Sequence, residues 1–342
     1  MNWRPELTLA NRFEIAGVAV GCSASPYVIA EAGSNFNQSM DTAKELIDVA
    51  AQAKADAVKF QLFRADVLYP GGGEMFDLFK SVELNAAWVP DLADYARSRK
   101  VAFMASAFDA ESVKVLERVG VPAMKVASSE TTNLPLLIEM ARLGRPMLLS
   151  TGMCDMIDVE TAVDICRGLG NTNVALMQCV AEYPLPVEGA DLRVLDTFAR
   201  RVGFSDHTLG LTAALAAVGL GATVFEKHFT LDKKAEGPDH FYALEPDDLT
   251  GYVAGIKEAY AALGSAEKKM SASERKHGRR EGLYAARAIS AGQRITAEDV
   301  AVKRPAQGIR GRYAQAIVGL TAARDVAQDA PIDWPDLRGD AS

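Results

Sequence analysis

Short apolar runs alternate along most of the chain with longer segments in which apolar residues recur at helical spacing. Between residues 26 and about 262, each run is five or six residues long. Runs of this length and composition predict buried strands, and their alternation with helical segments predicts parallel βα units. We expect eight strands, at residues 27–31, 57–61, 101–106, 123–127, 146–150, 174–179, 201–205 and 223–227.

The segments between these runs carry the 3.6-residue period of amphipathic helices. In residues 41–53, apolar side chains fall at positions i, i+3, i+4 and i+7 of one face. In residues 109–120, Asp109 is placed as the N-cap and Gly120 as the left-handed residue that ends the helix. Eight such units over about 240 residues favour a (β/α)8 TIM barrel, of class α/β. A doubly wound sheet usually carries a GxGxxG motif after its first strand, and this chain has none there.

The chain beyond the last of these units has a different character. Residues 264–280 are charged and poor in apolar side chains, which is typical of an interdomain linker. We therefore expect a barrel domain with a short N-terminal extension at residues 1–263 and a small β-rich domain at residues 281–342. In the latter, residues 289–295 and 326–332 share the spacing of an apolar residue, a turn residue and an isoleucine. Chance explains this echo, but two related halves of one domain explain it slightly better.

Composition and charge limit the classes of partner. The 342 residues carry a net charge of −8 with a pI near 5.2, which argues against nucleic acid or an anionic membrane as the main partner. The four cysteines form no CxxC pair, so neither a disulfide framework nor a cysteine zinc site is expected. The N-terminal residues lack the apolar stretch of a signal peptide, and Gly219 and Gly221 interrupt the longest apolar run. We therefore expect a cytoplasmic protein with no membrane span.

Polar side chains follow the apolar part of each predicted strand. In a barrel of this class the active site lies at the carboxyl ends of the strands. Helix capping or a structural ion pair explains each polar residue taken alone, but their recurrence indicates a site. Lys59, Lys125 and Lys227 with several serines predict a cradle for phosphate and carboxylate groups, and hence an anionic substrate. The full set is Glu31, Lys59, Gln61, Ser106, Lys125, Ser128, Glu130, Ser150, Tyr183, Ser205, Asp206, His207, Lys227 and His228.

His207 and His228 close the last two predicted strands, which are neighbours in a barrel. Two neutral imidazoles suit manganese, zinc or iron, and Asp206 is then expected to hold a ring tautomer. Two histidines bonded to backbone groups are the structural alternative. A glutamate such as Glu31 beside the metal would move a proton. The residues thus indicate a metal-assisted reaction on an anionic, phosphorylated small molecule, and they leave carbon–carbon bond formation and hydrolysis both open.

Nine short blocks carry a resemblance to a known family. They are IAEAGSN (29–35), ADAVKFQLF (55–63), MKVASSE (124–130), NLPLL (133–137), LLSTGM (148–153), FSDHTLG (204–210), FEKHFTLD (225–232), GPDHFYALEP (237–246) and KRP (303–305). In order and spacing they resemble the sialic acid (N-acetylneuraminate) synthase family, including the pseudaminic and legionaminic acid synthases, over nearly the full length. The resemblance implies a transferase that condenses phosphoenolpyruvate with an N-acylated hexosamine, giving a nine-carbon 2-keto sugar acid and phosphate. It also implies an antifreeze-like (SAF) C-terminal domain and a domain-swapped homodimer.

The same resemblance implies roles for particular residues. His207 and His228 would hold a divalent metal, Mn²⁺ foremost with Mg²⁺ or Co²⁺ as alternatives, and Glu31 would handle the proton at the sugar oxygen. Arg304 would reach over the barrel of the other chain in the dimer. The residues implied for phosphoenolpyruvate are Lys59, Ser106, Lys125, Ser128, Ser150 and Ser205, and those for the sugar are Gln61, Glu130, Tyr183, Asp239 and Arg304.

The chain departs from the family pattern near the expected acceptor site. Phe36 stands in a segment that commonly reads NHNG, Ser129 replaces a usual glycine, and Ala181 removes a hydrogen-bonding side chain. We therefore expect the reaction to be kept and the sugar to be the variable part, with N-acetylmannosamine and the diacetamido-trideoxyhexoses of the pseudaminic and legionaminic branches as acceptors. The alternatives are a metal-dependent hydrolase or lyase on the same barrel, and a binding protein that acts through its C-terminal domain.

Overall fold

The computed structural model describes residues 9–69, 71–198, 202–277 and 279–339. The chain divides into two compact units, Met1–Gly264 and Ser265–Ser342. The predicted domains extend beyond the described residues at 1–8 and 340–342, and so do residue 278 of the predicted linker and residue 201 of the predicted seventh strand.

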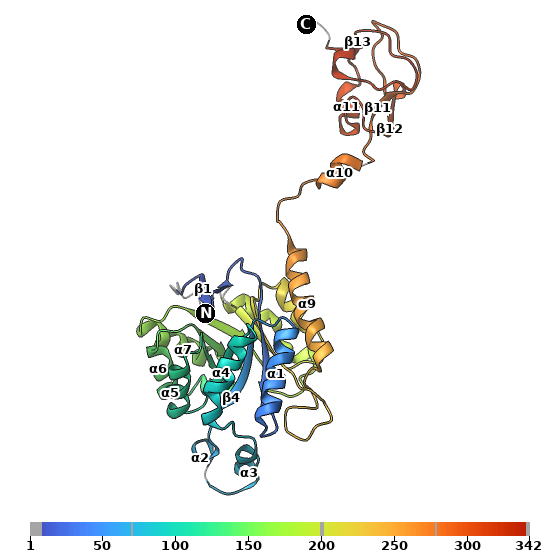
Figure 1. Cartoon of the computed structure of the whole chain (residues 1–342). Coiled ribbons are helices and arrows are strands. Elements are labelled where there is room, and N and C mark those ends of the chain that lie inside the picture. The colour runs from blue at the N-terminus through green and yellow to red at the C-terminus, as the bar shows by residue number, and fades with distance from the viewer. Residues whose placement is uncertain (1–8, 70, 199–201, 278, 340–342) are drawn as a thin grey trace. The chain divides into compact units, whose positions relative to one another are not determined.

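Eight parallel strands form one closed barrel (Figure 1), which confirms the predicted TIM-barrel class. Neighbouring strands follow chain order, and β10 pairs with β3 to close the barrel. Each strand is buried on both faces, by helices on the outside and by packed side chains inside the barrel. The strand sequences are therefore nearly continuous apolar runs. They are β3 (Tyr27–Gly33), β4 (Ala57–Leu62), β5 (Ala102–Ala107), β6 (Met124–Val126), β7 (Met147–Ser150), β8 (Val174–Gln178), β9 (Val202–Asp206) and β10 (Val224–His228).

The helices of the barrel unit begin and end largely where local sequence signals place them. Asp109 accepts hydrogen bonds from the first backbone amides of α5, and Gly120 ends that helix at φ +74°. The α-helices are α1 (Met40–Gln52), α2 (Ala65–Leu68), α3 (Glu74–Ser81), α4 (Val89–Ser98), α5 (Ala110–Val119), α6 (Leu134–Arg142), α7 (Met156–Gly168), α8 (Thr212–Gly219) and α9 (Pro246–Leu263). Short 3₁₀ helices are η1 (Ala86–Trp88), η2 (Ser128–Glu130), η3 (Val187–Ala190) and η4 (Leu192–Phe198).

A hairpin of β1 (Arg12–Ile15) and β2 (Val18–Gly21) closes the end of the barrel at which the strands begin. Phe13, Ile15 and Val20 of this hairpin belong to the same apolar cluster as Tyr27 and other inward residues of the strands. A second, larger cluster lies between the outer faces of the strands and the helices. The opposite end of the barrel, where the strands finish, is thereby left for polar side chains.

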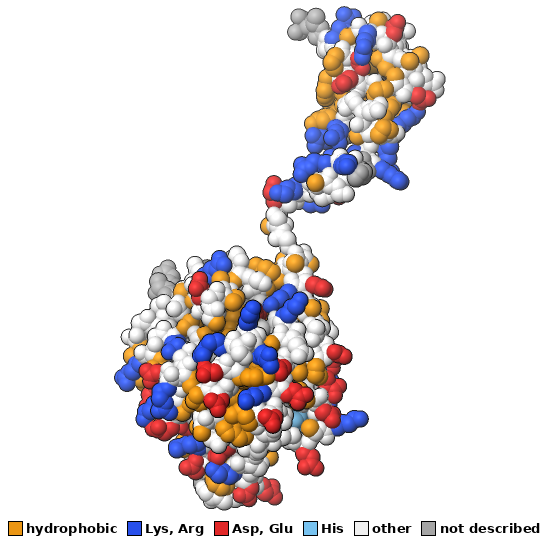
Figure 2. All heavy atoms as spheres, in the orientation of Figure 1, with side chains coloured by type: hydrophobic (Ala, Val, Ile, Leu, Met, Phe, Trp, Pro, Cys, Tyr) orange, Lys and Arg blue, Asp and Glu red, His pale blue; other side chains and the backbone are white. Residues whose placement is uncertain are grey.

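The C-terminal unit is small and rich in short strands and turns. Its core is built from nine buried apolar residues, several of them isoleucines, which supports an independent domain. The predicted linker contains one short helix, α10, and basic side chains gather around it (Figure 2). The elements are α10 (Ala272–His277), β11 (Gly282–Ala285), η5 (Ala297–Asp299), β12 (Val300–Lys303), η6 (Gly311–Tyr313), α11 (Ala314–Ile317), β13 (Thr321–Ala322), η7 (Trp334–Asp336) and β14 (Leu337–Arg338).

The two echoing segments of this unit occupy equivalent positions. Ile289 and Val326 pair through reciprocal backbone hydrogen bonds of 2.8 Å. Each segment leads into a 3₁₀ helix with a capping box, closed by Asp299 in one half and by Asp336 in the other. An arginine twelve residues earlier, in each half, donates to that buried carboxylate. The structure therefore supports two related halves rather than a chance echo.

Within the described residues, no helix combines the length and the apolar character needed to cross a membrane.

Candidate active site

Inward-facing side chains of the barrel change from apolar to polar toward the carboxyl ends of the strands. On β3, Ile29 lies in the apolar core inside the barrel, and Glu31 lines a pocket two residues further along. On β10, Val224 lies in that core, whereas Glu226 and His228 line the pocket. Side chains two residues apart on a strand share a face, so one strand supplies both apolar packing and polar chemistry.

The pocket has a volume of about 430 Å³ and lies where the strands finish. It brings together residues from all eight strands or the loops that follow them, as the barrel class predicts. Of the fourteen residues to which the family resemblance gives a role, twelve line it: Glu31, Lys59, Gln61, Ser106, Lys125, Ser128, Glu130, Ser150, Tyr183, Ser205, His207 and His228.

The two remaining residues of that set are Asp239 and Arg304. Asp239 accepts hydrogen bonds from Ser34 Oγ (3.2 Å) and Tyr242 Oη (2.9 Å), close to His228 across Gly33. Arg304 belongs to the C-terminal unit, where it precedes Pro305 through a cis peptide bond. Its position over the barrel of another chain stays a prediction.

Two buried lysines form the basic part of the pocket. Lys59 Nζ donates to Ser106 Oγ at 2.9 Å and lies 2.9 Å from Glu31 Oε2. Lys125 Nζ donates to Ser150 Oγ at 2.8 Å. Both lysines are 2% exposed. Each ammonium is thus paired with a serine hydroxyl, and these are two of the three lysines that the sequence predicts for an anion cradle.

Glu226 is a charged pocket residue that the sequence reasoning missed. Its carboxylate lies 3.5 Å from Lys125 Nζ and 3.7 Å from Lys59 Nζ, and it accepts a hydrogen bond from Ser205 Oγ at 3.3 Å. The available signal was its position two residues before His228, which puts both on one face of β10. The lysine cradle therefore contains an internal carboxylate between its two cations.

Burial and charge act in opposite directions on the two carboxyl groups. Burial raises the pKa of Glu31 to about 7, although Lys59 opposes this and Glu226 adds to it. Burial also acts to raise the pKa of Glu226, but Lys125 and Lys59 outweigh it and lower the pKa below its ordinary range. Glu31 is therefore the carboxyl group that exchanges a proton near neutral pH, whereas Glu226 stays ionised.

Lys227 and Asp206 lie outside the barrel wall, which corrects two predictions. Lys227 Nζ is 3.0 Å from Asp206 Oδ2, and the ring of Tyr252 from α9 lies beside it. Adjacent residues of a strand face opposite sides, so Lys227 points away from the pocket that Glu226 and His228 line. Lys227 is therefore not part of the anion cradle, and the expectation that Asp206 holds a histidine tautomer was also wrong.

The two histidines face each other inside the pocket, with ring centroids 5.7 Å apart. His207 Nδ1 lies 2.7 Å from the carbonyl oxygen of Val180, which can only accept, so this nitrogen carries a hydrogen, and in the neutral form of the ring the lone pair is then on Nε2. Burial lowers the pKa of His228, which keeps that ring neutral, and its Nδ1 is buried without a hydrogen-bond partner in the described structure. Tyr183 packs against both rings.

This donor set fits a divalent cation. Imidazoles in their neutral form are suitable ligands. A cation bound here would also supply a partner for the buried Nδ1 of His228, which has no hydrogen bond in the described structure. Among the described residues, no group of three or more histidine, cysteine or acidic side chains is arranged to hold an ion. A cation held by His207 and His228 would keep further positions open for water and substrate oxygens.

Comparison with known proteins places the chain in a family. The NeuB family model matches residues 46–268, and the SAF domain model matches residues 280–338. The chain belongs to the NeuB family. This confirms the resemblance to the sialic acid synthases and the SAF character of the C-terminal domain.

The relatives of this NeuB-family chain match it over most of their own length. A spore coat polysaccharide biosynthesis protein of Bacillus subtilis is 39% identical over 95% of this chain and 97% of its own. An N,N'-diacetyllegionaminic acid synthase of Legionella pneumophila is 35% identical over 93% of this chain and 96% of its own. The crystal structure of an N-acetylneuraminic acid synthetase from Leptospira borgpetersenii is similar with a TM-score of 0.74, at 29% identity over 78% of this chain and 95% of that one.

The three departures from the family pattern have different consequences in this NeuB-family structure. Phe36 is fully buried and packs edge-on against Phe60 and Trp88, so it belongs to the core and not to the pocket. Ser129 Oγ donates to Glu130 Oε1 at 3.1 Å and thereby orients a pocket carboxylate. Ala181 lines the pocket itself. Of the three, only Ser129 and Ala181 line the pocket.

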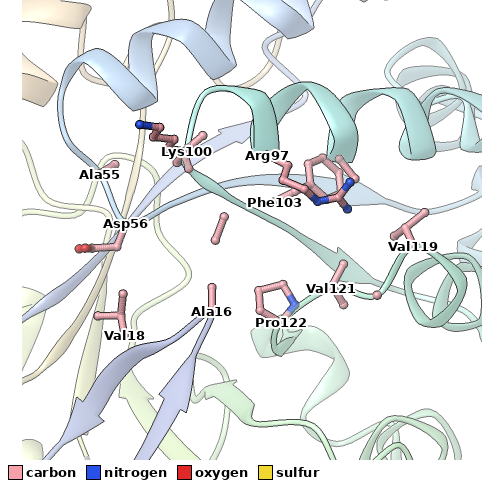
Figure 3. A pocket seen from close by; sticks show the side chains of 14 residues that line it. Ala16, Val18, Ala55, Asp56, Arg97, Lys100, Phe103, Val119, Val121 and Pro122 are labelled. Carbon is pink, nitrogen blue, oxygen red and sulfur yellow. The ribbon is translucent and has the colours of Figure 1, made fainter.

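A second pocket of similar volume, about 420 Å³, lies at the opposite end of the barrel (Figure 3). Its walls come from the tip of the β1–β2 hairpin, the residues before β4 and β5, helix α4 and the end of α5. It contains none of the predicted site residues. Volume alone thus does not distinguish the two pockets of this NeuB-family barrel, and the buried lysines and histidines make the pocket at the carboxyl ends of the strands the candidate active site.

Proposed function

We propose that this protein condenses phosphoenolpyruvate with an N-acylated hexosamine to give a nine-carbon 2-keto sugar acid and phosphate. One observation carries the proposal: two buried lysines, each bonded to a serine hydroxyl, lie in the same pocket as two histidines whose ring centroids are 5.7 Å apart. A cradle of this kind suits a small molecule with both phosphate and carboxylate groups. Family membership supports a synthase of sugar acids.

In this proposal Lys59 and Lys125 bind the anionic groups of phosphoenolpyruvate, assisted by the serine hydroxyls of the pocket. A divalent cation, Mn²⁺ foremost, would be held by His207 and His228 and would polarise the aldehyde of the acceptor sugar. Carbon 3 of phosphoenolpyruvate then attacks the aldehyde carbon, and the carbonyl oxygen becomes a hydroxyl by taking a proton that Glu31 supplies.

Water next adds to carbon 2, and phosphate leaves by cleavage of the carbon–oxygen bond, which produces the 2-keto acid. Negative charge shifts along the substrate during these steps. Lys59 and Lys125 are buried away from bulk water, where their charges stabilise such a transition state more strongly than in solution. Glu31, with a pKa of about 7, is suited to take a proton back from the attacking water.

The acceptor is proposed as N-acetylmannosamine or a diacetamido-trideoxyhexose. Relatives named as legionaminic and pseudaminic acid synthases support the second group, at 35% and 26% identity. One altered hydroxyl or methyl group in such a site changes specificity by only about 1 to 3 kcal/mol, so the sugar is decided by assay. The product would enter the synthesis of surface glycans.

The deciding experiment measures phosphate released from phosphoenolpyruvate by the purified chain with Mn²⁺ and each acceptor in turn. Release that requires one of these sugars supports the proposal, and its absence with all of them overturns it. Lys125→Met is the matched variant, because it removes one buried ammonium and keeps all but one atom of the side-chain length; phosphate release should fall in this variant. Turnover of a sugar phosphate without phosphoenolpyruvate would instead favour the hydrolase or lyase alternative.

We also propose that two chains form a domain-swapped homodimer in the cytoplasm, where phosphoenolpyruvate is made. Large apolar side chains on loops after the strands support a covering partner, because exposed apolar surface of this kind marks interaction sites. Met153, Leu209 and Phe241 are 71%, 64% and 59% exposed. In the dimer, Arg304 of one chain would reach the sugar bound in the other.

A further inference from the structure

A buried polar network lies on the outer side of the barrel wall, behind the two histidines. Lys227 Nζ lies 3.0 Å from Asp206 Oδ2 and also donates to the carbonyl oxygen of Thr208. Asp206 Oδ1 accepts from the backbone amide (2.8 Å) and the hydroxyl (2.7 Å) of Thr208. Tyr252 Oη, from α9, donates to Asp206 Oδ2 at 3.0 Å. All four residues are at most 2% exposed.

Fold stability gives no sufficient reason for this network. Removing a lysine and an aspartate from water is costly, and well-packed apolar residues in place of a buried ion pair are often as stable or more so. The β9–β10 pairing already joins the two strands, and α9 already packs through Leu249, Val253 and Ile256. A charged network at this position therefore calls for another explanation.

The network holds the backbone on both sides of the histidine pair. His207 lies between Asp206 and Thr208, which are bonded to each other. Lys227 directly precedes His228 and reaches across to the carbonyl oxygen of Thr208. Since alternate residues face opposite sides of the wall, each bond on the outside restrains a backbone segment that carries an imidazole on the inside.

We infer that Asp206, Lys227 and Tyr252 are positioning residues that set the separation of the His207 and His228 imidazoles and thereby the affinity of the pair for a divalent cation. The inference rests on the proposed function, because it takes the two histidines as the metal ligands. Residues that orient metal ligands from outside commonly change metal affinity without touching the ion.

The test is Mn²⁺ binding by the full-length protein without substrates, with free Mn²⁺ counted by electron paramagnetic resonance. Lys227→Met shortens the side chain by one atom and removes its charge. We expect its Mn²⁺ affinity to fall by roughly 10- to 100-fold, the usual range for such orienting groups. Tyr252→Phe removes one hydroxyl and keeps the ring, so a smaller but measurable loss of affinity is expected.

Lys257→Met is the matched control. Lys257 also lies on α9 and pairs with Asp56 at 3.3 Å, but near the other end of the barrel. Its loss should leave Mn²⁺ affinity as in the unsubstituted protein. Native affinity in both Lys227→Met and Tyr252→Phe would overturn the inference, and if Lys227→Met does not fold, Tyr252→Phe decides. A lack of Mn²⁺ binding by the unsubstituted protein would overturn the proposed metal pair together with this inference.

Discussion

At Glu31, two opposing effects meet on a single carboxyl group. Burial raises its pKa to about 7, whereas the ammonium of Lys59, 2.9 Å away, lowers it. The outcome is a carboxyl group that both gives and takes a proton near neutral pH, as the proposed reaction requires at the sugar oxygen and at the attacking water. Its neighbour Gln61 donates to the other carboxyl oxygen at 3.1 Å and keeps it in place.

This pKa leads to a prediction about stability and pH. The pKa of Glu31 is about 7 in the folded chain against an ordinary value of 4.5, so protonation favours the folded state. The stabilisation is complete below pH 4.5 and is lost as the pH rises through 7. Relative to Glu31→Gln, the unsubstituted protein should therefore lose free energy of unfolding across this range, measured by urea denaturation. Glu14→Gln, at an exposed carboxylate, is the control and should follow the unsubstituted protein. If the free energy of unfolding of Glu31→Gln changed with pH in the same way as that of the unsubstituted protein, the prediction would be contradicted.

The histidines give a second prediction at this scale. His207→Ala and His228→Ala should each lower metal-dependent turnover by at least about 100-fold, because either change removes a ligand that is proposed to polarise the aldehyde. The melting temperature of His228→Ala should stay near normal, since His228 Nδ1 has no hydrogen-bond partner in the described structure to lose. His207→Ala should melt slightly lower, because it removes the hydrogen bond to the carbonyl oxygen of Val180. Activity and calorimetry on the same samples check this. Full activity in either variant would show that the histidines are structural.

At the scale of elements, the end of β3 shows how backbone shape places side chains. The register between β3 and β4 shifts between Glu31 and Gly33, and Gly33 has φ +54°. A Cβ atom there would lie 2.8 Å from Asp239 Oδ2 and 3.4 Å from His228 Nδ1. Glycine thus lets β3 turn away while Asp239 approaches the histidine.

Gly33→Ala should therefore cost about 1 to 2 kcal/mol for its left-handed backbone and should also displace Asp239. We expect a raised KM for the acceptor sugar in steady-state kinetics. Gly120→Ala is a matched control, because Gly120 has φ +74° but a Cβ atom added there would meet no heavy atom within 4 Å. Equal kinetic effects of the two substitutions would contradict the proposed place of Asp239.

At the scale of the whole molecule, the C-terminal unit is a small domain separate from the barrel. It has its own core and an internal duplication, so it folds around contacts of its own. A basic linker precedes it, with Lys268, Lys269, Arg275, Lys276 and Arg279 close in sequence. A self-contained unit on a linker is what the proposed domain swap requires.

Domain swapping predicts complementation between two defective chains. Arg304→Ala should raise the KM of the acceptor more than that of phosphoenolpyruvate, and His207→Ala should be inactive. Co-expressed, the two variants would form heterodimers with one intact site, so that about a quarter of all sites regain normal kinetics. Activity of heterodimers purified through two different tags checks this. Isolated heterodimers without recovered activity would contradict the swapped arrangement.

Sequence alone determined the features that depend on local period and local capping. Eight apolar runs at βα spacing predict the barrel, and Asp109 and Gly120 mark the bounds of α5, because a cap bonds only to its own helix. Polar residues after the strands predict most of the pocket, since parallel strands bring their carboxyl ends together.

Tertiary structure decided which alternate residues face inward. Every residue of β10 is buried, because helices cover one face of the strand and the barrel interior covers the other. The sequence therefore lacks the alternation of buried and exposed residues that would separate Lys227 from Glu226 and His228. Phe36 likewise belongs to the core through contacts with Phe60 and Trp88, which lie far away in sequence. A two-residue period says that neighbours on a strand point apart, but only the closed barrel determines which of them meets the substrate.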